Sequence, residues 1–190
     1  MNILASLSEK ADEPAGTYVG CKVSPFEEAH RELFQAIVGL EGSKVPAKKL
    51  HTTVIYSKKY VDPKLLEPAL EGYNQQPLQG TIIGAAAFDA LPKADGTRAD
   101  DVATLVIKLK CDPLLELHAA LKELGCTHTY PELSPHVSLF YGVPKEECHA
   151  AVERLNTAIS KLTEPLTVEL HSLYAEPIKQ DWAEKNTTKR

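Results

Sequence analysis

The alternation of hydrophobic and polar residues predicts strands and helices in an order that repeats along the chain. In the first half the predicted elements are a strand over 17–23, a helix from Pro25 to the glycines at 39–42, a strand over 50–57 and a short helix over 63–71. In the second half they are strands over 78–89 and 102–110, a helix over 113–124, a strand over 134–141, a helix over 145–161 and a strand over 165–174. Strand, long helix, strand and helix therefore occur twice, which favours an α+β fold built from two similar lobes.

The two long helices that precede the repeated strands are predicted from their first residues and their apolar spacing. Ser24 is a residue type that caps helices, and Pro25 suits the first helical position. The apolar residues that follow are spaced as on one face of a helix (Ala29, Leu33, Phe34, Ile37 and Val38). In the second half, Asp112 precedes a helix whose leucines form one stripe (Leu114, Leu117, Leu121 and Leu124).

Two of the predicted strands carry the same short motif. His51 is followed two positions later by Thr53, and His136 is followed two positions later by Ser138. Residues i and i+2 of a strand point to the same face, so each strand presents one imidazole and one hydroxyl together. Because both strands hold the same place in the repeated order, we expect the two lobes to bring these pairs together across one cleft.

Two opposed histidines and two hydroxyls suit acid–base chemistry on a phosphodiester. Imidazole changes its protonation near neutral pH, so one histidine can accept a proton while the other donates one. The hydroxyls of Thr53 and Ser138 can donate hydrogen bonds to the non-bridging phosphate oxygens. A single His-x-Thr strand is usually structural, and it is the repeated context that distinguishes this pair. We assign no chemistry to the other histidines and expect those in predicted helices at surface or boundary positions (His30, His118 and His149).

Composition and charge narrow the class of protein and of ligand. The chain has 190 residues, of which 43% are hydrophobic and 25% charged, as expected for a single globular domain. It contains no apolar stretch of membrane-spanning length and no recognisable export signal, so we expect a cytoplasmic protein. The four cysteines lack CxxC spacing, which favours reduced thiols and no zinc site. A net charge of −5 argues against long RNA or DNA as the ligand and favours a small one.

With these motifs, the chain resembles the 2H phosphoesterase superfamily, which is named for two His-x-Thr/Ser motifs on paired lobes. The resemblance extends from Tyr18 to Trp182 and includes the order of the elements. It implies the LigT-like fold, in which two pseudo-symmetric βαβ-type lobes place their antiparallel sheets around a central cleft. The lobes would comprise residues 15–75 with the C-terminal strand, and residues 76–163.

The same resemblance implies roles for the residues of the two motifs. His51 and His136 would be the general acid and the general base, and Thr53 and Ser138 would bind the phosphate. No metal and no other cofactor would take part. The expected substrates are 2′,3′-cyclic phosphates or related phosphodiesters of the RNA type.

A narrower resemblance is to the phage anti-CBASS phosphodiesterases, which degrade cyclic oligonucleotide signals. Members carry an aromatic residue on the first strand, and an acidic residue and a tryptophan near the C-terminus. Here Tyr18 stands 33 residues before His51, and Glu176 and Trp182 follow the predicted last strand. The resemblance implies that Tyr18, Glu176 and Trp182 bind the substrate, the rings by stacking on nucleobases. It also implies phage origin and action in the host cytoplasm.

These features lead to one main hypothesis and three alternatives. The main hypothesis is a metal-independent phosphodiesterase that hydrolyses 3′–5′ cyclic di- or trinucleotides, such as cyclic GMP-AMP, to linear products and so blocks CBASS immunity. An alternative within the superfamily is a 2′,3′-cyclic phosphodiesterase that acts on RNA ends. From a different class, a nucleotide-binding sponge would need a pocket but no opposed histidines. A purely structural protein is least favoured, because nothing structural requires the duplicated motif.

Overall fold

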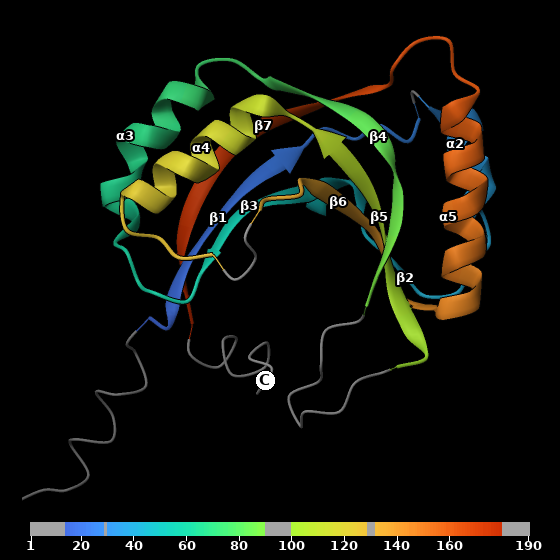
Figure 1. Cartoon of the computed structure of the whole chain (residues 1–190), viewed down its shortest axis with the longest axis horizontal. Coiled ribbons are helices and arrows are strands. Elements are labelled where there is room, and N and C mark those ends of the chain that lie inside the picture. The colour runs from blue at the N-terminus through green and yellow to red at the C-terminus, as the bar shows by residue number, and fades with distance from the viewer. Residues whose placement is uncertain (1–13, 29, 90–99, 129–131, 180–190) are drawn as a thin grey trace, which may run out of the picture.

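The computed structural model of the chain describes residues 14–28, 30–89, 100–128 and 132–179 (Figure 1). Its strands are β1 (Gly16–Val23), β2 (Ser43–Lys44), β3 (His51–Ser57), β4 (Leu78–Asp89), β5 (Val102–Lys110), β6 (His136–Pro144) and β7 (Thr167–Ile178). Its helices are α2 (Arg31–Phe34), α3 (Pro63–Asn74), α4 (Asp112–Glu123) and α5 (Lys145–Ser160), with 3₁₀ turns at Gln35–Ile37 and Ala47–Lys49. Trp182 lies outside the described residues.

The seven strands form one sheet, in the order β2-β6-β5-β4-β7-β1-β3, and every neighbouring pair is antiparallel. This confirms the expected α+β class with antiparallel strands. Strand β1 pairs with β3 and β7, and strand β5 pairs with β4 and β6, so the strands form two groups. Residues 78–81 of β4 also pair with residues 167–170 of β7, and this contact joins the two halves into a continuous sheet.

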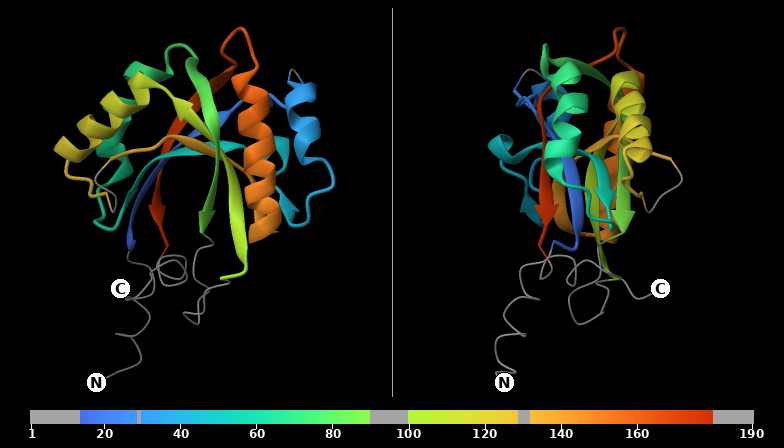
Figure 2. Two further views of the ribbon diagram at one scale, coloured as in Figure 1. Left: turned by 45° about the vertical axis from the view of Figure 1, so that its right-hand side comes forward. Right: turned by 90° about the vertical axis from the view of Figure 1, so that its left-hand side faces the viewer.

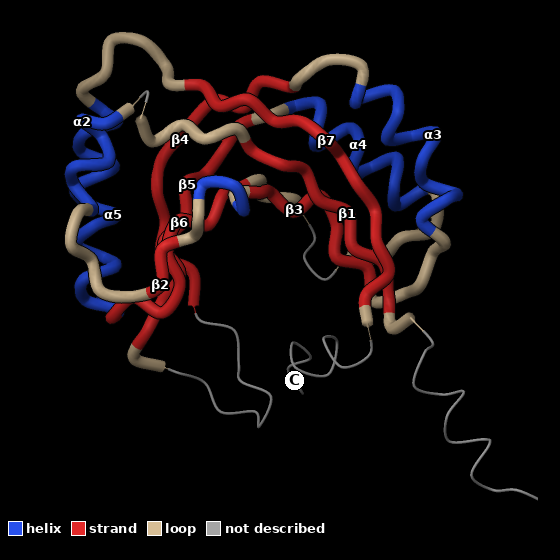
Figure 3. The backbone as a smooth tube through the Cα atoms, turned by 180° about the vertical axis from the view of Figure 1, so that it is seen from behind, coloured by secondary structure: helices blue, strands red, loops and turns tan. Residues whose placement is uncertain are grey.

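The sheet is strongly curved, and its helices cover the outer, convex face (Figures 2 and 3). On one flank α3 and α4 pack against β7 and β3, and on the other flank α5 packs against β4 and β5 with α2 beside it. The curvature brings β3 and β6 into contact although they lie near opposite ends of the strand order. The two motif strands therefore meet on the inner, concave face.

The core lies between the convex face of the sheet and the helices. Leu114, Leu117 and Leu121 of α4 are completely buried, which confirms the predicted stripe over these three positions. Burial of each such side chain stabilises the fold by roughly 1.5–3 kcal/mol. Leu124 was expected in the same stripe, but it lies just after the helix and is 46% exposed.

The long helix predicted from Pro25 is wrong, because α2 has only four residues and continues as a single 3₁₀ turn. Ser24 does not cap a helix, since its backbone N–H and its hydroxyl both bond to Glu169 of β7. This attachment fixes the chain leaving β1 against the sheet in place of a helical first turn. Val38, expected on the buried face, is 82% exposed. Ala29, from the same predicted helix, lies outside the described residues.

Two further positions differ from the expectation. The last strand continues to Ile178, so Glu176 lies inside β7 and does not follow it. The longer strand is explained by its interior place in the sheet, where β1 supplies pairing partners for this segment. His118, expected at a surface or boundary position, is buried on α4 with 6% of its surface exposed.

The remaining expectations concern the state of the cysteines and the presence of membrane-spanning segments. All four cysteines are buried and none forms a disulfide. Burial and the neighbouring Cys111 raise the pKa of Cys21 to about 12, so this thiol is a packing group. Within the described ranges, none of the helices combines the length and apolar character needed to cross a membrane.

Candidate active site

His51 and His136 occupy the same position on their strands, the first residue of β3 and of β6. The Nδ1–H of His51 donates to the carbonyl oxygen of Lys49, and the Nδ1–H of His136 donates to that of Ser134, each over 2.9 Å. A carbonyl accepts only, so both rings carry a proton on Nδ1. The Nε2 atoms, bonded to no described residue, are left to exchange a proton with a ligand.

The two histidines are electrostatically coupled across the concave face. Burial lowers the pKa of His136, and the nearby charge of His51 lowers it further, whereas the carbonyl of Ser134 raises it. The net direction is downward, so His136 is held in its neutral form at neutral pH. The structure thus brings the two predicted histidines together and makes their environments unequal.

Each motif is followed directly by a β-bulge in its strand. Thr53 lies opposite Gly20 and the next paired residue is Ile55, so Val54 has no partner on β1. In β6, Leu139 is skipped in the same way, immediately after Ser138. A bulge adds one residue to a strand and changes which side chains face the same way.

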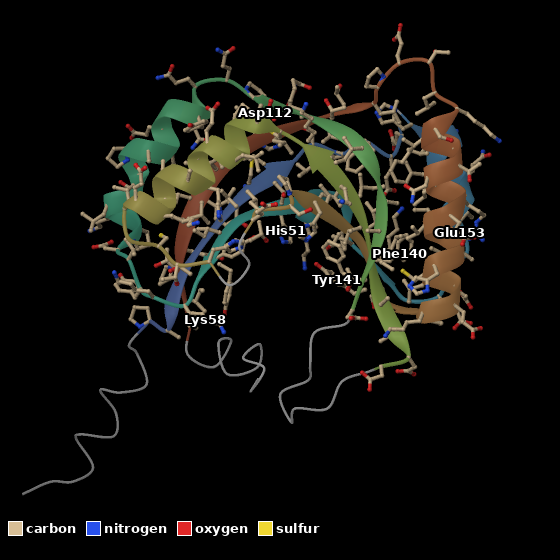
Figure 4. The ribbon with its side chains drawn as sticks, in the orientation of Figure 1. His51, Lys58, Asp112, Phe140, Tyr141 and Glu153 are labelled. Carbon is tan, nitrogen blue, oxygen red and sulfur yellow. The ribbon has the colours of Figure 1, made fainter. Side chains whose placement is uncertain are left out.

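The bulges also place a tyrosine beside each motif. Tyr56 and Tyr141 both stand five positions after their histidine. Tyr56 lies opposite Tyr18, and Tyr141 points to the inner side of the sheet together with His51 (Figure 4). The concave face therefore carries histidine, hydroxyl residue and tyrosine twice.

A lysine lies directly across the ladder from each histidine. Lys22 of β1 is opposite His51, and Lys108 of β5 is opposite His136. Directly opposite residues of an antiparallel pair have side chains on the same face. Neither lysine forms an ion pair within the described part of the chain. Neither lysine was expected in the site from the sequence, although Lys22 alternates with Tyr18 and Gly20 along the first strand.

Tyr18 is in contact with the first motif. Its hydroxyl and the Thr53 hydroxyl form a hydrogen bond of 3.2 Å, and its ring lies 5.9 Å from that of Tyr174. Gly20 leaves room for both rings, since a Cβ there would lie 2.7 Å from a ring carbon of Tyr18 and 2.9 Å from the Tyr174 hydroxyl. Burial raises the pKa of Tyr18 above its ordinary value, so its hydroxyl keeps the proton.

Glu176 lies beside Tyr18 as its direct partner on β7. The structure therefore brings together Tyr18, Glu176 and the first motif, as the sequence suggested. Trp182 was expected in the same group, but it lies outside the described residues.

The second motif has an apolar neighbour that the sequence analysis missed. The ring of Phe88 meets His136 edge to face, with 4.8 Å between ring centroids. Phe88 lies near the end of β4, where strand alternation alone gives no reason to assign it to the site. Its contact contributes to the removal of His136 from water.

Outside the two motifs, the described residues form no metal site, and two cavities lie away from the motif histidines. No three histidine, cysteine, aspartate or glutamate side chains of the described segments gather in a way that could hold a metal. Two cavities of about 470 and 420 Å³ lie beside α2 and at the end of α3, and neither is lined by a motif histidine.

The sequence of the chain is similar to those of known phage proteins. A family model described as "Anti-CBASS protein Acb1" matches residues 15–185. The chain is 28% identical to the Acb1 protein of Vibrio phage KVP40 over 174 residues, covering 92% of this chain and 95% of that protein. It is 26% identical to the Acb1 protein of Enterobacteria phage T4 over 178 residues, covering 94% and 98%.

Among solved structures, E. coli LigT complexed with ATP is similar over 89% of this chain and 100% of that one, with 14% identity and a TM-score of 0.43. The family match confirms the narrower resemblance expected from the two histidine motifs, and with it the expectation of an enzyme. The match covers most of the sequence, and the chain therefore belongs to the anti-CBASS protein Acb1 family.

Proposed function

We propose that the protein is a metal-independent phosphodiesterase that hydrolyses 3′–5′ cyclic di- and trinucleotide signals in the host cytoplasm and thereby blocks CBASS immunity. The observation that carries the proposal is the matched anchoring of His51 and His136, which leaves two Nε2 atoms for proton transfer on one face. Family membership supports the biological role. The net charge of −5 favours a small ligand over long nucleic acid.

In the proposed first step, the ribose 2′-hydroxyl attacks the adjacent phosphorus. Nε2 of His136 takes the proton of that hydroxyl, and the Nε2–H of His51 gives a proton to the departing 5′-oxygen. The products are a 2′,3′-cyclic phosphate end and a 5′-hydroxyl end on one linear molecule. The lowered pKa of His136 supports its role as the base, because a base must enter the reaction neutral.

In the second step the two histidines exchange roles. His51, now neutral, takes a proton from water as the water attacks phosphorus, and His136 returns its proton to the leaving ribose oxygen. The cyclic phosphate is thereby opened to a monoester. Both histidines finish in their starting protonation states, so no external acid or base is consumed.

Four further groups would stabilise the charge that develops on phosphate. The hydroxyls of Thr53 and Ser138 would donate to the non-bridging oxygens, and Lys22 and Lys108 would flank the phosphate with positive charge. The hydrogen bond between Tyr18 and Thr53 supports this role, because it restricts rotation of the Thr53 hydroxyl.

We assign nucleobase binding to the strands β1 and β7, which lie beside the first motif. The rings of Tyr18 and Tyr174 would stack on a base, a contact worth roughly 1–3 kcal/mol. Glu176, opposite Tyr18, would accept a hydrogen bond from a base amino group or a ribose hydroxyl. Trp182 remains a substrate-binding residue proposed from the sequence.

The test is product analysis by mass spectrometry with cyclic GMP-AMP in excess EDTA. We expect linear product and a transient 2′,3′-cyclic phosphate, and none when the attacking ribose is 2′-deoxy. Activity lost on chelation, or retained on the 2′-deoxy substrate, would contradict the mechanism. An RNA oligomer ending in a 2′,3′-cyclic phosphate belongs in the same panel, and strong preference for it would favour the RNA-end alternative.

A further inference from the structure

His118 of α4 reaches from the convex side of the sheet to the first motif strand. Its Nδ1–H donates to the carbonyl oxygen of Val54 over 2.8 Å, inside the protein. The ring of His128 packs against it edge to face, with 4.5 Å between centroids. His118 Nε2 is buried without a hydrogen-bond partner among the described residues, so the one described polar contact of this side chain is the bond to Val54.

Val54 is the residue that the β1 ladder skips, immediately after Thr53. A bulge disrupts the ladder locally, and a buried carbonyl there needs a hydrogen-bond donor from elsewhere. His118 supplies that donor. The bond therefore fixes the peptide between Val54 and Ile55, in the bulge that directly follows Thr53.

In the second motif strand, the equivalent carbonyl accepts a hydrogen bond from a donor other than a histidine. Leu139 is the skipped residue after Ser138, and its carbonyl accepts the backbone N–H of Val45 over 2.8 Å. The carbonyl of Leu139 is thus bonded by the residue that follows β2, in continuation of the β2–β6 pairing, and the carbonyl of Val54 by a side chain. The equivalent carbonyl is therefore held in both halves.

We propose that His118 is a positioning residue for the phosphate-binding hydroxyl of Thr53. It holds the Val54 bulge, and the bulge aims Thr53 at the phosphate from the concave face. His118 itself lies on the convex side and touches no substrate. The inference rests on the proposed function, since it is the reaction there that uses Thr53.

The kinetic test compares two substitutions of His118. In His118→Asn the amide nitrogen can replace Nδ1 as donor, whereas His118→Leu has similar bulk and no donor. We expect His118→Leu to lower kcat about tenfold to hundredfold with little change in KM, as for a small misplacement of a reacting group. His118→Asn should retain most of the activity, and His149→Leu, at an exposed site on α5, should retain all of it.

A double-substitution cycle separates positioning from general destabilisation. If His118 acts through Thr53, then His118→Leu should have almost no further effect once Thr53→Ala is present. An equal loss in both backgrounds would overturn the proposal, as would full activity of His118→Leu. If His118→Leu does not fold, His118→Gln, whose donor reaches a different point, takes its place in the cycle.

Hydrogen exchange gives a readout that does not depend on activity. In His118→Leu, amides of residues 51–57 should exchange faster, while those of residues 136–144 should be unchanged because Val45 still holds that bulge. Uniform acceleration in both strands, or none in either, would overturn the proposal. The two proposals can fail separately. If the wild-type protein cleaves no cyclic nucleotide but His118→Leu still shows faster exchange in residues 51–57 alone, the proposed function fails and the link between His118 and the bulge stands.

Discussion

The two motif strands carry the same set of groups and differ in the residues that surround them. Both present histidine, hydroxyl residue, bulge and tyrosine on the motif strand, and a lysine on the next strand. Four residues before that lysine, the first half has Tyr18 paired with Glu176, whereas the second has Thr104 paired with Phe88. The symmetric part suits a phosphate between two proton carriers. The unequal part lowers the pKa of His136 and places Tyr18 and Glu176 beside the first motif alone.

The comparison is tested most strongly by removing each histidine in turn. His51→Ala and His136→Ala should each lower kcat by roughly 10²–10⁴, the usual contribution of one proton transfer. A substrate with sulfur in place of the bridging 5′-oxygen should restore cleavage to His51→Ala, because a thiolate leaves without a proton. It should not restore His136→Ala. Rescue of His136→Ala alone would reverse the assignment of acid and base.

The lysines should contribute equally if the phosphate site is symmetric. Lys22→Met and Lys108→Met should each weaken turnover about 10- to 150-fold, which corresponds to losing one hydrogen bond to a charged group, about 1.5–3 kcal/mol. Measurement of kcat/KM against salt concentration tests this, because the salt dependence should fall in both variants. Lys58→Met, at an exposed site after β3, is the matched control. A loss confined to one lysine would show that the phosphate lies off the symmetry axis.

Tyr18→Phe should have a smaller effect that is confined to the first half. It removes the hydrogen bond to Thr53 while keeping the ring, so about 0.5–1.5 kcal/mol is lost, or about two- to tenfold in kcat. Binding of a non-cleavable cyclic dinucleotide, followed by calorimetry, should be almost unchanged because stacking is kept. Strongly weakened binding would show that the hydroxyl contacts the ligand directly.

The smallest expected effect is on the pH dependence of kcat/KM. Because the pKa of His136 is lowered and the base must be neutral, the acid limb of kcat/KM should lie below the ordinary histidine value of about 6.5. Phe88→Ala admits water to His136, so it should move this limb to higher pH and leave the optimum rate within tenfold. An unchanged limb would show that desolvation by Phe88 does not set the protonation of His136.

Much of the fold could be predicted because strand alternation survives in the final structure. The strands at 78–89 and 102–110 begin and end where the pattern places them. The helix after Pro25 failed for a reason that no local pattern contains, namely the bonds from Ser24 to Glu169, 145 positions later.

In the candidate site too, features of a single strand could be predicted and features that depend on neighbouring strands could not. The motif histidines and hydroxyls are recognisable because their spacing of two is a property of a single strand. Lys22 and Lys108 lie beside the histidines because of the register between neighbouring strands. The bulges at Val54 and Leu139 likewise exist only in relation to the strand that each motif strand pairs with. Register depends on which strands become adjacent, and one chain segment read alone does not reveal it.

The position of β7 in the sheet has a consequence for synthesis of the protein. β7 lies between β4 and β1, so β1 and β3 are joined to β4, β5 and β6 only when residues 167–178 are available. During translation the chain emerges from its N-terminus, and the strand that joins the two parts of the sheet is therefore made after the other described strands. We expect nascent chains that end before β7 to lack a folded reaction centre although both histidines are already present. The enzyme then becomes active in a single late event, when one strand closes the sheet.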